Sequence, residues 1–582
     1  MLTLARITNE AYKIRWDHSG DPIPPISYLV SARNDTAAFQ IVLQSNYQYS
    51  VSTRPVEYFS RKAGIRGYHE RIRVAVSAPF NVELNLEDLM IDHDDIKKAD
   101  VLLKQDVLEC PANLPSGVWA EIKVPRDAVP GIYTVNVKVF VSGYGDDESL
   151  AFEQDIPLTV AEYVLPDAKD WSIYVNLWQH VSTLAIYHDV SLWSDEHFDV
   201  IQKYIDAISA LGQRSITVCA GNIPWGGWGC NNSYEHFANL YQYSIIGITK
   251  KADGTFFYDY SKMQRYIDIC TKAGMTGDIE IFGIVNVWQK NAVRNLCEDY
   301  PEKNIVLRYL DETDGKMKYI REREDVIAYV KALEQYFIRT GQIERVRIGA
   351  DEPGDVERYR ESLNLLNEIA PSFKCSAAIY HSDFVEKFKD NIETMSPSIG
   401  TACREYRQLT EHKAEFPHKK LLWYVCGHNG FPNNCIINPL ADNRAIGLLN
   451  DILGFDGILR WNFCLYTEDP RKDIRFSPIG AGDINFVYPS KNGSLLLSLR
   501  YKNLQRGLAD YELIHALRAK DPDSADKLMA SICNFSVKDL AEFNTLRGKI
   551  GGNPDQNRHL AVMSRNWDDY NDLKAKVLQL LT

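Results

Sequence analysis

Two adjacent carboxylates, Asp351 and Glu352, come at the end of an apolar segment in the run IGADEPGD (348–355). Such a pair suits acid–base chemistry, because one carboxyl can donate a proton while its ionised neighbour stabilises developing positive charge. A structural alternative is that Asp351 or Asp355 caps the helix-like segment DVERYRESL that follows, as Asx residues often do. The position of the pair at the end of a predicted barrel strand favours the catalytic interpretation.

The carboxylates elsewhere in the sequence decide which reaction this pair suits. A retaining glycosidase of the usual kind needs a second carboxylate about 5 Å from the first, across the sugar. The seventh strand, in LLWYVCGHNG, offers none, and neither does the ILRWNF part of the eighth; Asp278 and Glu280 fall at the start of the third strand, at the opposite end. An adjacent Asp–Glu pair instead suits a reaction in which the substrate's own 2-acetamido oxygen attacks the anomeric carbon. In that reaction Asp351 orients the amide and Glu352 protonates the leaving oxygen.

The sequence is rich in aromatic residues, with 32 Tyr, 22 Phe and 11 Trp. Several rings fall at or near the ends of predicted strands or in the glycine-rich second loop: Trp178, Trp225, Trp228, Trp288, Tyr380, Trp423, Tyr424 and Trp461. Polar residues at the same end are suited to holding sugar hydroxyls: Asn176, His428, Arg460 and Asn462. Core packing is the alternative for any single ring, but the whole set at one end predicts a sugar-binding wall.

Strand-like and helix-like segments alternate after Trp171. The predicted strands are SIYVNLW (172–178), SITVCAGN (215–222), IEIFGIVN (279–286), ERVRIGA (344–350), KCSAAIY (374–380), SIGTA (398–402), KLLWYVC (420–426) and DGILRWNF (456–463). Helical patterns cover 197–212, 260–274, 324–341, 355–370 and 443–454. Eight strands alternating with helices predict an α/β fold, a (β/α)8 TIM barrel. The rival, a doubly wound open sheet, lacks a GxGxxG or GxxxxGK[ST] run after its first strand.

The flanking regions complete a three-part plan. Residues 1–165 contain short alternating strands separated by Pro, Gly and Asp, which predicts an N-terminal β-sandwich domain. The catalytic barrel is expected over 171–515, and a helical C-terminal extension over 516–582.

Charge and cysteine usage exclude several classes of function. The net charge of −13, without any basic cluster, argues against a nucleic-acid partner. No apolar stretch is long enough for a membrane span, and the N-terminus has no signal h-region, so a cytoplasmic location is expected unless a leader was removed. The eleven cysteines are scattered singly and the His show no HExxH or HxH spacing, so neither a metal site nor another cofactor is expected. The oligomeric state stays open.

Several runs resemble a known family. GADEP (349–353), LLWYVCG, NRAIG and GFDGILRWNF are similar to segments of glycoside hydrolase family 123. The most specific match is a C-terminal signature, here Gly482-Asp483, Tyr488-Pro489, Ser498, Arg500 and Gly507 to Glu512. The resemblance implies a β-sandwich, a (β/α)8 barrel and a helical extension. It also implies an exo-acting, retaining β-N-acetylgalactosaminidase with substrate assistance, in which Asp351 stabilises the acetamido group, Glu352 is the acid/base and Tyr380 hydrogen-bonds the acetamido group.

Two other functions remain open from the sequence. One is a hydrolase for another sugar, in which Glu405 or Glu468 reaches the site from a loop. The other is a carbohydrate-binding barrel without activity, suggested by Ile348 and Ala350, where members of the family often carry His and Ser.

Overall fold

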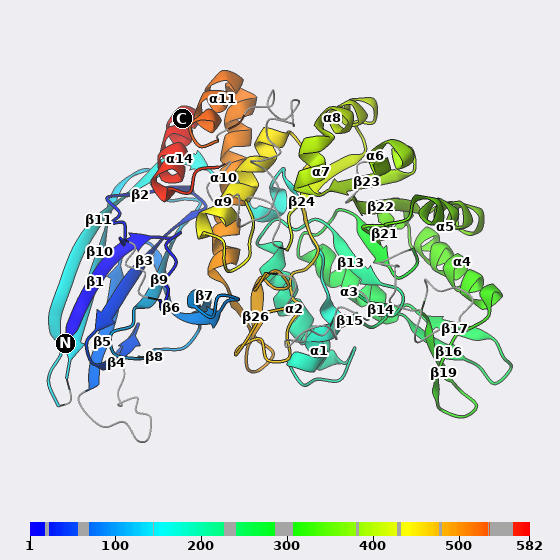
Figure 1. The fold of residues 1–582 in the computed structure, drawn as a ribbon, viewed down its shortest axis with the longest axis horizontal. Coiled ribbons are helices and arrows are strands. Elements are labelled where there is room, and N and C mark those ends of the chain that lie inside the picture. Colours follow the sequence, from blue (N-terminus) through cyan, green and yellow to red (C-terminus); the bar gives the residue numbers. More distant parts are fainter. Residues whose placement is uncertain are drawn as a thin grey trace.

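The computed structural model describes residues 1–17, 22–55, 69–143, 145–225, 240–285, 306–379, 383–427, 432–476, 480–533, 535 and 563–582. Figure 1 shows two parts, an N-terminal group of β-sheets and an α/β part around a curled parallel sheet, with helices α9 and α10 between them. No helix among the described residues is long and apolar enough to cross a membrane.

The N-terminal part consists of two sheets around one apolar core. The first sheet has the order β1 (Leu2–Asn9), β3 (Asp35–Ser45), β9 (Ser116–Val124), β6 (Asn81–Ile91) and β7 (Lys97–Leu103). The second has the order β2 (Leu29–Arg33), β11 (Ser149–Val164), β10 (Gly131–Ser142), β5 (His69–Ser77), β4 (Gln48–Ser52) and β8 (Val107–Cys110). Residues from both sheets, such as Phe39, Ile41, Val135 and Val137, share one buried cluster. The prediction that this region is built of β-strands is confirmed.

The α/β part contains one sheet of eight parallel strands. Its order is β12 (Tyr174–Leu177), β25 (Gly457–Arg460), β24 (Lys420–Tyr424), β23 (Ile392–Pro397), β22 (Lys374–Ile379), β21 (Val346–Asp351), β18 (Ile279–Phe282) and β13 (Ile216–Cys219). Consecutive parallel strands are therefore neighbours, and helices cover the outer face of the sheet (Figure 1). Seven of the eight predicted strands are confirmed.

The predicted sixth strand is wrong. Residues 398–402 begin helix α7 (Ile399–Arg404), and the strand is β23, immediately before it. Ser398 is the N-cap residue of this helix, since its hydroxyl accepts a hydrogen bond from the Thr401 amide. The capping serine, rather than the β-branched residues around it, decides the local structure.

The described helices lie mainly between the strands of this sheet or after it. They are α1 (Leu184–Tyr187), α2 (Asp195–Ser209), α3 (Ser261–Lys272), α4 (Arg323–Arg339), α5 (Val356–Ile369), α6 (Asp383–Phe388), α7, α8 (Tyr406–Glu415), α9 (Leu440–Leu453), α10 (Leu499–Lys520), α11 (Pro522–Ala530) and α14 (Trp567–Leu581). The five predicted helices are confirmed as α2, α3, α4, α5 and α9. Helix α10 crosses the boundary expected at 515.

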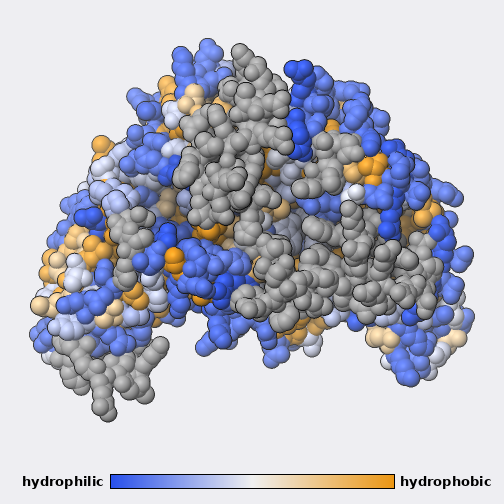
Figure 2. All heavy atoms as spheres, viewed as in Figure 1, coloured by the Kyte–Doolittle hydropathy of each residue, from blue (hydrophilic) through white to orange (hydrophobic). Residues whose placement is uncertain are grey.

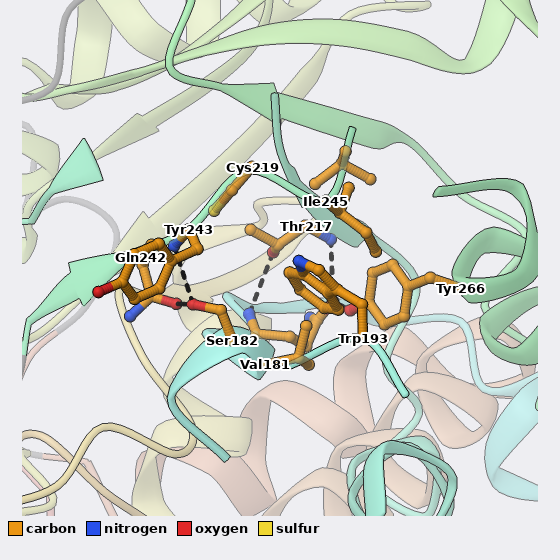
Figure 3. Close-up of a pocket in the computed structure, with 11 residues that line it drawn as sticks. Val181, Ser182, Trp193, Thr217, Cys219, Gln242, Tyr243, Ile245 and Tyr266 are labelled. Atoms are coloured by element: carbon orange, nitrogen blue, oxygen red, sulfur yellow. Dashed lines mark hydrogen bonds between the residues drawn. The ribbon is translucent and has the colours of Figure 1, made fainter. Parts of the chain in front are cut away.

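The two edge strands of the curled sheet, β12 and β13, meet at a seam. A single backbone bridge joins Val175 to Gln213. The Gln213 side chain accepts a hydrogen bond from the Leu177 amide (2.8 Å) and donates one to the Leu177 carbonyl (3.1 Å). Gln179 and Thr217 add two more bonds, which Figure 3 shows beside a small cavity. Hydrogen bonds from side chains thus connect β12 to β13, whereas a ladder of backbone hydrogen bonds connects the other neighbouring strands.

Helix α10 joins the N-terminal sheets to α9, and we call this region the α10 joint. Arg500 forms a bidentate ion pair with Asp100 of β7 (2.9 and 2.8 Å), and the Tyr488 hydroxyl donates to the same carboxylate. Gly507 packs so closely on the Arg444 carbonyl of α9 that a Cβ atom there would collide with it, and Gly447 contacts Gly507 in the same way. The C-terminal signature therefore builds a close crossing of helices and a buried ionic contact.

Smaller sheets are inserted in the loops or follow β25: β14 (Ile223–Pro224) with β15 (Tyr241–Gln242), a sheet of order β17 (Phe256–Asp259), β16 (Gly247–Lys250), β19 (Arg308–Asp311) and β20 (Met317–Tyr319), and β26 (Val487–Pro489) with β27 (Leu495–Leu497). In the four-stranded sheet, Thr249 pairs with both Phe257 and Leu310, and Leu310 pairs with Met317. The exposed side chains of Phe257, Leu310 and Met317 therefore lie in one row across the sheet. Figure 2 shows hydrophobic atoms at this lower right corner of the surface.

Candidate active site

The carboxylate pair lies at the carboxyl end of β21. Asp351 is the last residue of this strand and is buried, while Glu352 follows it and is partly exposed. Side chains of consecutive strand residues point to opposite faces. Glu352, however, has φ of +45°, a left-handed conformation that is uncommon for a residue with a side chain. The turn of the backbone at Glu352 breaks the alternation, so both carboxyls can serve the same end of the sheet.

Two neutral donors bind these carboxyls. The Trp225 indole N–H donates to Asp351 Oδ2 at 3.1 Å, and the Tyr424 hydroxyl donates to Glu352 Oε1. Burial, together with the nearby charge of Glu352, raises the pKa of Tyr424 well above its usual value, so this hydroxyl stays a donor. The Glu352 amide also donates to the Ala378 carbonyl of β22 (3.2 Å), which fixes the backbone beside the pair.

A layer of aromatic rings packs around Asp351. The Trp225 ring lies 5.3 Å from Trp178 and 4.9 Å from Phe282, measured between centroids, and Phe282 is also 4.9 Å from Trp178. Gly349 of β21 makes room for Phe282, because a Cβ atom there would lie 2.6 Å from the ring. Trp178 and Trp225 are both buried, so the described structure uses these two predicted wall residues as the packed layer that holds Asp351.

Glu280 lies below this layer, inside the sheet. It is buried and accepts hydrogen bonds from Asn176 Nδ2 (2.9 Å) and Trp178 Nε1 (3.0 Å). Burial raises its pKa in spite of these donors. Asn176 and Trp178 thus have a described partner within the protein. The sequence placed Glu280 near the start of a strand but gave no sign that it organises this interior.

The loop after β25 is held by Asp483. This buried carboxylate accepts hydrogen bonds from Arg460 Nη2 (3.0 Å) and Trp461 Nε1 (2.9 Å), and its backbone carbonyl accepts from Asn462 Nδ2 (2.6 Å). Three predicted site residues are therefore positioned by one aspartate. Its signal in the sequence was the Gly482-Asp483 motif, to which no role had been assigned.

Neighbouring residues of β24 point in opposite directions. Tyr424 faces the interior of the sheet with Leu422, whereas Trp423 packs in the outer core, and its indole N–H donates to Asn450 of α9 (2.9 Å). The structure therefore brings Tyr424 to the carboxylate pair but does not bring Trp423 there.

The remaining predicted residues divide into two groups. Trp228, Trp288, Tyr380 and His428 lie outside the described residues. The two loop carboxylates of the alternative function are described: Glu405 is 3.5 Å from the Arg404 guanidinium, and Glu468 lines a surface groove together with Lys104 and Tyr187. His180 was not predicted, yet its ring lies 4.4 Å from Trp225. It follows Trp178 by two residues at the end of the first strand, which was the available signal.

Comparison with protein families matches most of the α/β part of the chain. The family described as "Glycoside hydrolase 123, catalytic domain" matches residues 178–517, which include the site described above except Asn176. No functionally curated protein matches the chain.

Comparison with solved structures gives a close match in fold. A family 123 glycoside hydrolase from Clostridium perfringens, whose structural study concerns glycolipid glycan hydrolysis, aligns over 100% of this chain and 97% of its own, with a TM-score of 0.72 and 18% identity. A β-D-glucuronidase from Dictyoglomus thermophilum covers 79% of this chain and 62% of its own (TM-score 0.26, 11% identity). A cyclomaltodextrinase covers 88% and 85% (TM-score 0.31, 11% identity). The last two are too distant to carry an argument.

Proposed function

Because the chain belongs to glycoside hydrolase family 123, we propose that it removes a terminal β-linked N-acetylgalactosamine from a glycoconjugate, with retention of configuration. The observation that carries this proposal is the Asp351–Glu352 pair, in which each carboxyl accepts a hydrogen bond from a neutral donor on a different element. We take the curled sheet to be a (β/α)8 barrel with its site at the carboxyl ends of the strands. The side-chain bonds across the β12–β13 seam support that view.

The proposed nucleophile is the acetamido oxygen of the substrate. It attacks the anomeric carbon as the bond to the leaving oxygen breaks, and Glu352 gives its proton to that oxygen. Asp351 accepts the amide N–H and stabilises the positive oxazolinium ion that forms. Glu352, now ionised, then takes a proton from water, and the oxygen of that water opens the ring at the anomeric carbon. Two displacements at one carbon retain the β configuration.

The proposed substrate is a glycan with a terminal N-acetylhexosamine, including the glycan of a glycolipid. The glycolipid part of this proposal comes from the Clostridium perfringens enzyme, which shares the fold. N-acetylgalactosamine and N-acetylglucosamine differ at C4 alone, and we propose the first because of the family resemblance.

A panel of 4-nitrophenyl β-glycosides tests the proposal. We expect hydrolysis of the N-acetylgalactosaminide and inhibition by a thiazoline analogue of the oxazolinium ion. Asp351→Asn should lower kcat/KM about a thousandfold on all substrates, as expected when a preorganised stabilising group is lost. Glu352→Gln should abolish cleavage of an alkyl glycoside, whose leaving group needs a proton, while the nitrophenyl glycoside loses less.

Other outcomes favour the two alternatives. Activity on glycosides without a 2-acetamido group, together with insensitivity to the thiazoline, would indicate a hydrolase that uses a carboxylate nucleophile. Binding of N-acetylgalactosamine without turnover of any aryl glycoside would indicate a carbohydrate-binding protein.

A further inference from the structure

We propose that His180 is a positioning residue, which holds the Trp225 indole so that its N–H donates to Asp351. The inference rests on the proposed role of Asp351 and adds a residue that does not itself touch the reacting atoms. It names a chain of three contacts: from the Trp461 carbonyl to His180, from His180 to Trp225, and from Trp225 to Asp351.

The His180 ring is anchored by a hydrogen bond and packs against the Trp225 ring in a T-shaped arrangement. His180 Nε2 lies 2.8 Å from the Trp461 carbonyl oxygen, and the ring meets Trp225 edge-on, with centroids 4.4 Å apart and planes at 86°. His180 itself is fully buried. A carbonyl can accept a hydrogen bond but cannot donate one, so Nε2 carries the proton. This bond fixes both the tautomer and the orientation of the ring.

Burial keeps this ring neutral. It lowers the pKa of His180 to about 4, and Nδ1 has no hydrogen-bond partner among the described residues. A charged imidazolium here would alter the electrostatic environment of Asp351, whereas a neutral ring affects Trp225 by packing alone. His180 therefore fixes Trp225 without adding a charge to the site.

The Trp225 indole is confined from several sides. Trp178 and Phe282 pack on it together with His180, and its N–H reaches Asp351 Oδ2 at 3.1 Å. The described groups that titrate beside Asp351 include Glu352, which follows it on the chain, Tyr424 from β24 and the thiol of Cys426 just after that strand. A donor held on a carboxylate favours its ionised form and limits its rotation. Both effects serve a group that must accept the acetamido N–H.

The chain contains a matched control nearby. Trp193 also packs on a buried histidine, His197, with centroids 5.2 Å apart, and His197 Nε2 lies 3.0 Å from the Val181 carbonyl. The pKa of His197 is likewise lowered to about 4 by burial. The Trp193 indole N–H, however, donates to the Ser244 carbonyl (3.1 Å). Trp193 also lines the small cavity at the seam (Figure 3). Each pair therefore consists of a tryptophan and a buried histidine, but the Trp225 indole donates to Asp351 whereas the Trp193 indole donates to a backbone carbonyl.

The first test compares pH profiles of kcat/KM on a nitrophenyl β-N-acetylhexosaminide. We expect Trp225→Phe and His180→Phe to lower kcat/KM by about 10-fold to 100-fold, as for loss of a hydrogen bond to a charged group. Both should move the acidic limb to higher pH by about one unit, because Asp351 loses a donor that favours ionisation. Trp193→Phe should change neither. The double variant Trp225→Phe/His180→Phe should be no worse than Trp225→Phe, since His180 acts through the indole.

Losses of the two single variants that add in the double variant, or a normal acidic limb in His180→Phe, would overturn the proposal. If His180→Phe does not fold, His180→Gln is used, because its amide can still donate to the Trp461 carbonyl while the ring on Trp225 is lost.

The second test does not depend on activity. In protein labelled with ¹⁵N-tryptophan, the Trp225 indole resonance is assigned by its loss in Trp225→Phe. It should shift in Asp351→Asn and in His180→Phe, but not in Trp193→Phe. A resonance that responds to Asp351→Asn and ignores His180→Phe would rule out His180 as the positioning residue. An enzyme inactive on every glycoside contradicts the proposed function and leaves this readout intact.

Discussion

The carboxylates at the end of β21 and those of the α10 joint are both buried or partly buried, but they are held by different kinds of partner. In the joint each carboxylate pairs with a cation: Asp100 pairs with Arg500, in addition to the hydrogen bond from Tyr488, and Asp510 pairs with Arg444 (2.6 Å). At the end of β21 the donors described are neutral, an indole and a phenol. The difference separates carboxylates paired with a buried cation from the pair in which we propose that Glu352 gives up and takes back a proton.

The pKa values in the joint show what a cation partner does. Burial by itself would raise the pKa of Asp35 and Glu121, but the nearby Lys574, Lys502 and Arg506 lower both pKa values instead. Such groups stay ionised near neutral pH and cannot donate a proton. A general acid must be able to hold a proton, and the donor described at Glu352, Tyr424, is a neutral phenol rather than a cation.

The largest expected effect tests the joint. Arg444→Leu removes one partner of the buried pair with Asp510 and also the contact with Glu10 (3.1 Å), so it leaves two buried carboxylates short of a cation. We expect a loss of about 3–5 kcal/mol in the free energy of unfolding, measured with urea. The kcat of the folded variant should stay within about twofold of the wild type, since the pair lies outside the site.

Lys123→Leu is the control for that change. It breaks an exposed ion pair with Glu83 (2.8 Å) and should cost less than about 1 kcal/mol. Comparable losses in the two variants would contradict the distinction between buried and exposed pairs.

The second prediction concerns Glu87, a buried carboxyl of β6 that has no cation partner among the described residues. Both its oxygens lack a hydrogen-bond partner among the described residues, and burial raises its pKa to about 8. Folded Glu87 keeps its proton while the unfolded chain ionises above about pH 4.5, so stability is lost as the pH rises from that value towards 8. Glu87→Gln should therefore raise the free energy of unfolding by roughly 2 kcal/mol at pH 7.5.

The pH dependence distinguishes this cause from simple repacking. The advantage of Glu87→Gln should shrink towards pH 4.5, and Glu83→Gln, at an exposed position of the same strand, should change stability by less than about 0.5 kcal/mol. An advantage that is the same at pH 5 and pH 7.5 would show that the raised pKa is not its source.

The third prediction tests the neutral donor at the site. Tyr424→Phe keeps the ring but removes the hydroxyl that donates to Glu352. We expect kcat/KM to fall about 10-fold to 100-fold on substrates with poor leaving groups, and less on nitrophenyl glycosides. A variant with wild-type activity on both would mean that Glu352 does not depend on this donor.

The smallest effect belongs to the neighbour of Tyr424. Trp423→Phe loses the hydrogen bond to Asn450 in the outer core, which should cost about 1 kcal/mol of stability. Because Trp423 faces away from the carboxylate pair, kcat/KM should change less than twofold. A raised KM in this variant would mean that the ring does contribute to sugar binding.

The sequence predicted the order of strands and helices well, because apolar periodicity and helix ends depend on local physics. The sixth strand failed where a capping serine, Ser398, outweighed the β-branched residues beside it. At the site the sequence placed Asp351 and Glu352 correctly at the end of β21. The left-handed turn at Glu352 has no sequence signal, since it depends on contacts with β22 and β24.

For the remaining site residues, the alternation of side chains along a strand contains more information than the sequence prediction used. Trp423 and Tyr424 are adjacent, so only one of them can face the interior of the sheet, and the alternation of β24 already contains that information. Asp483, by contrast, is linked to Arg460 and Trp461 by the folded chain alone. The C-terminal signature was the most specific feature of the sequence, yet most of it holds the α10 joint together and only Asp483 reaches the site.

The seam between β12 and β13 has a consequence for how the protein opens. Most neighbouring strands of the sheet protect their amides with a ladder of backbone hydrogen bonds, whereas one backbone bridge and the side chains of Gln179 and Gln213 span the seam. Amide hydrogens of Leu177 and Thr217 should therefore exchange with solvent sooner than those of β21 and β22, in an opening smaller than global unfolding. Trp178 and His180 follow directly on β12, so such an opening would loosen the layer beneath Asp351 before any other part of the sheet gives way.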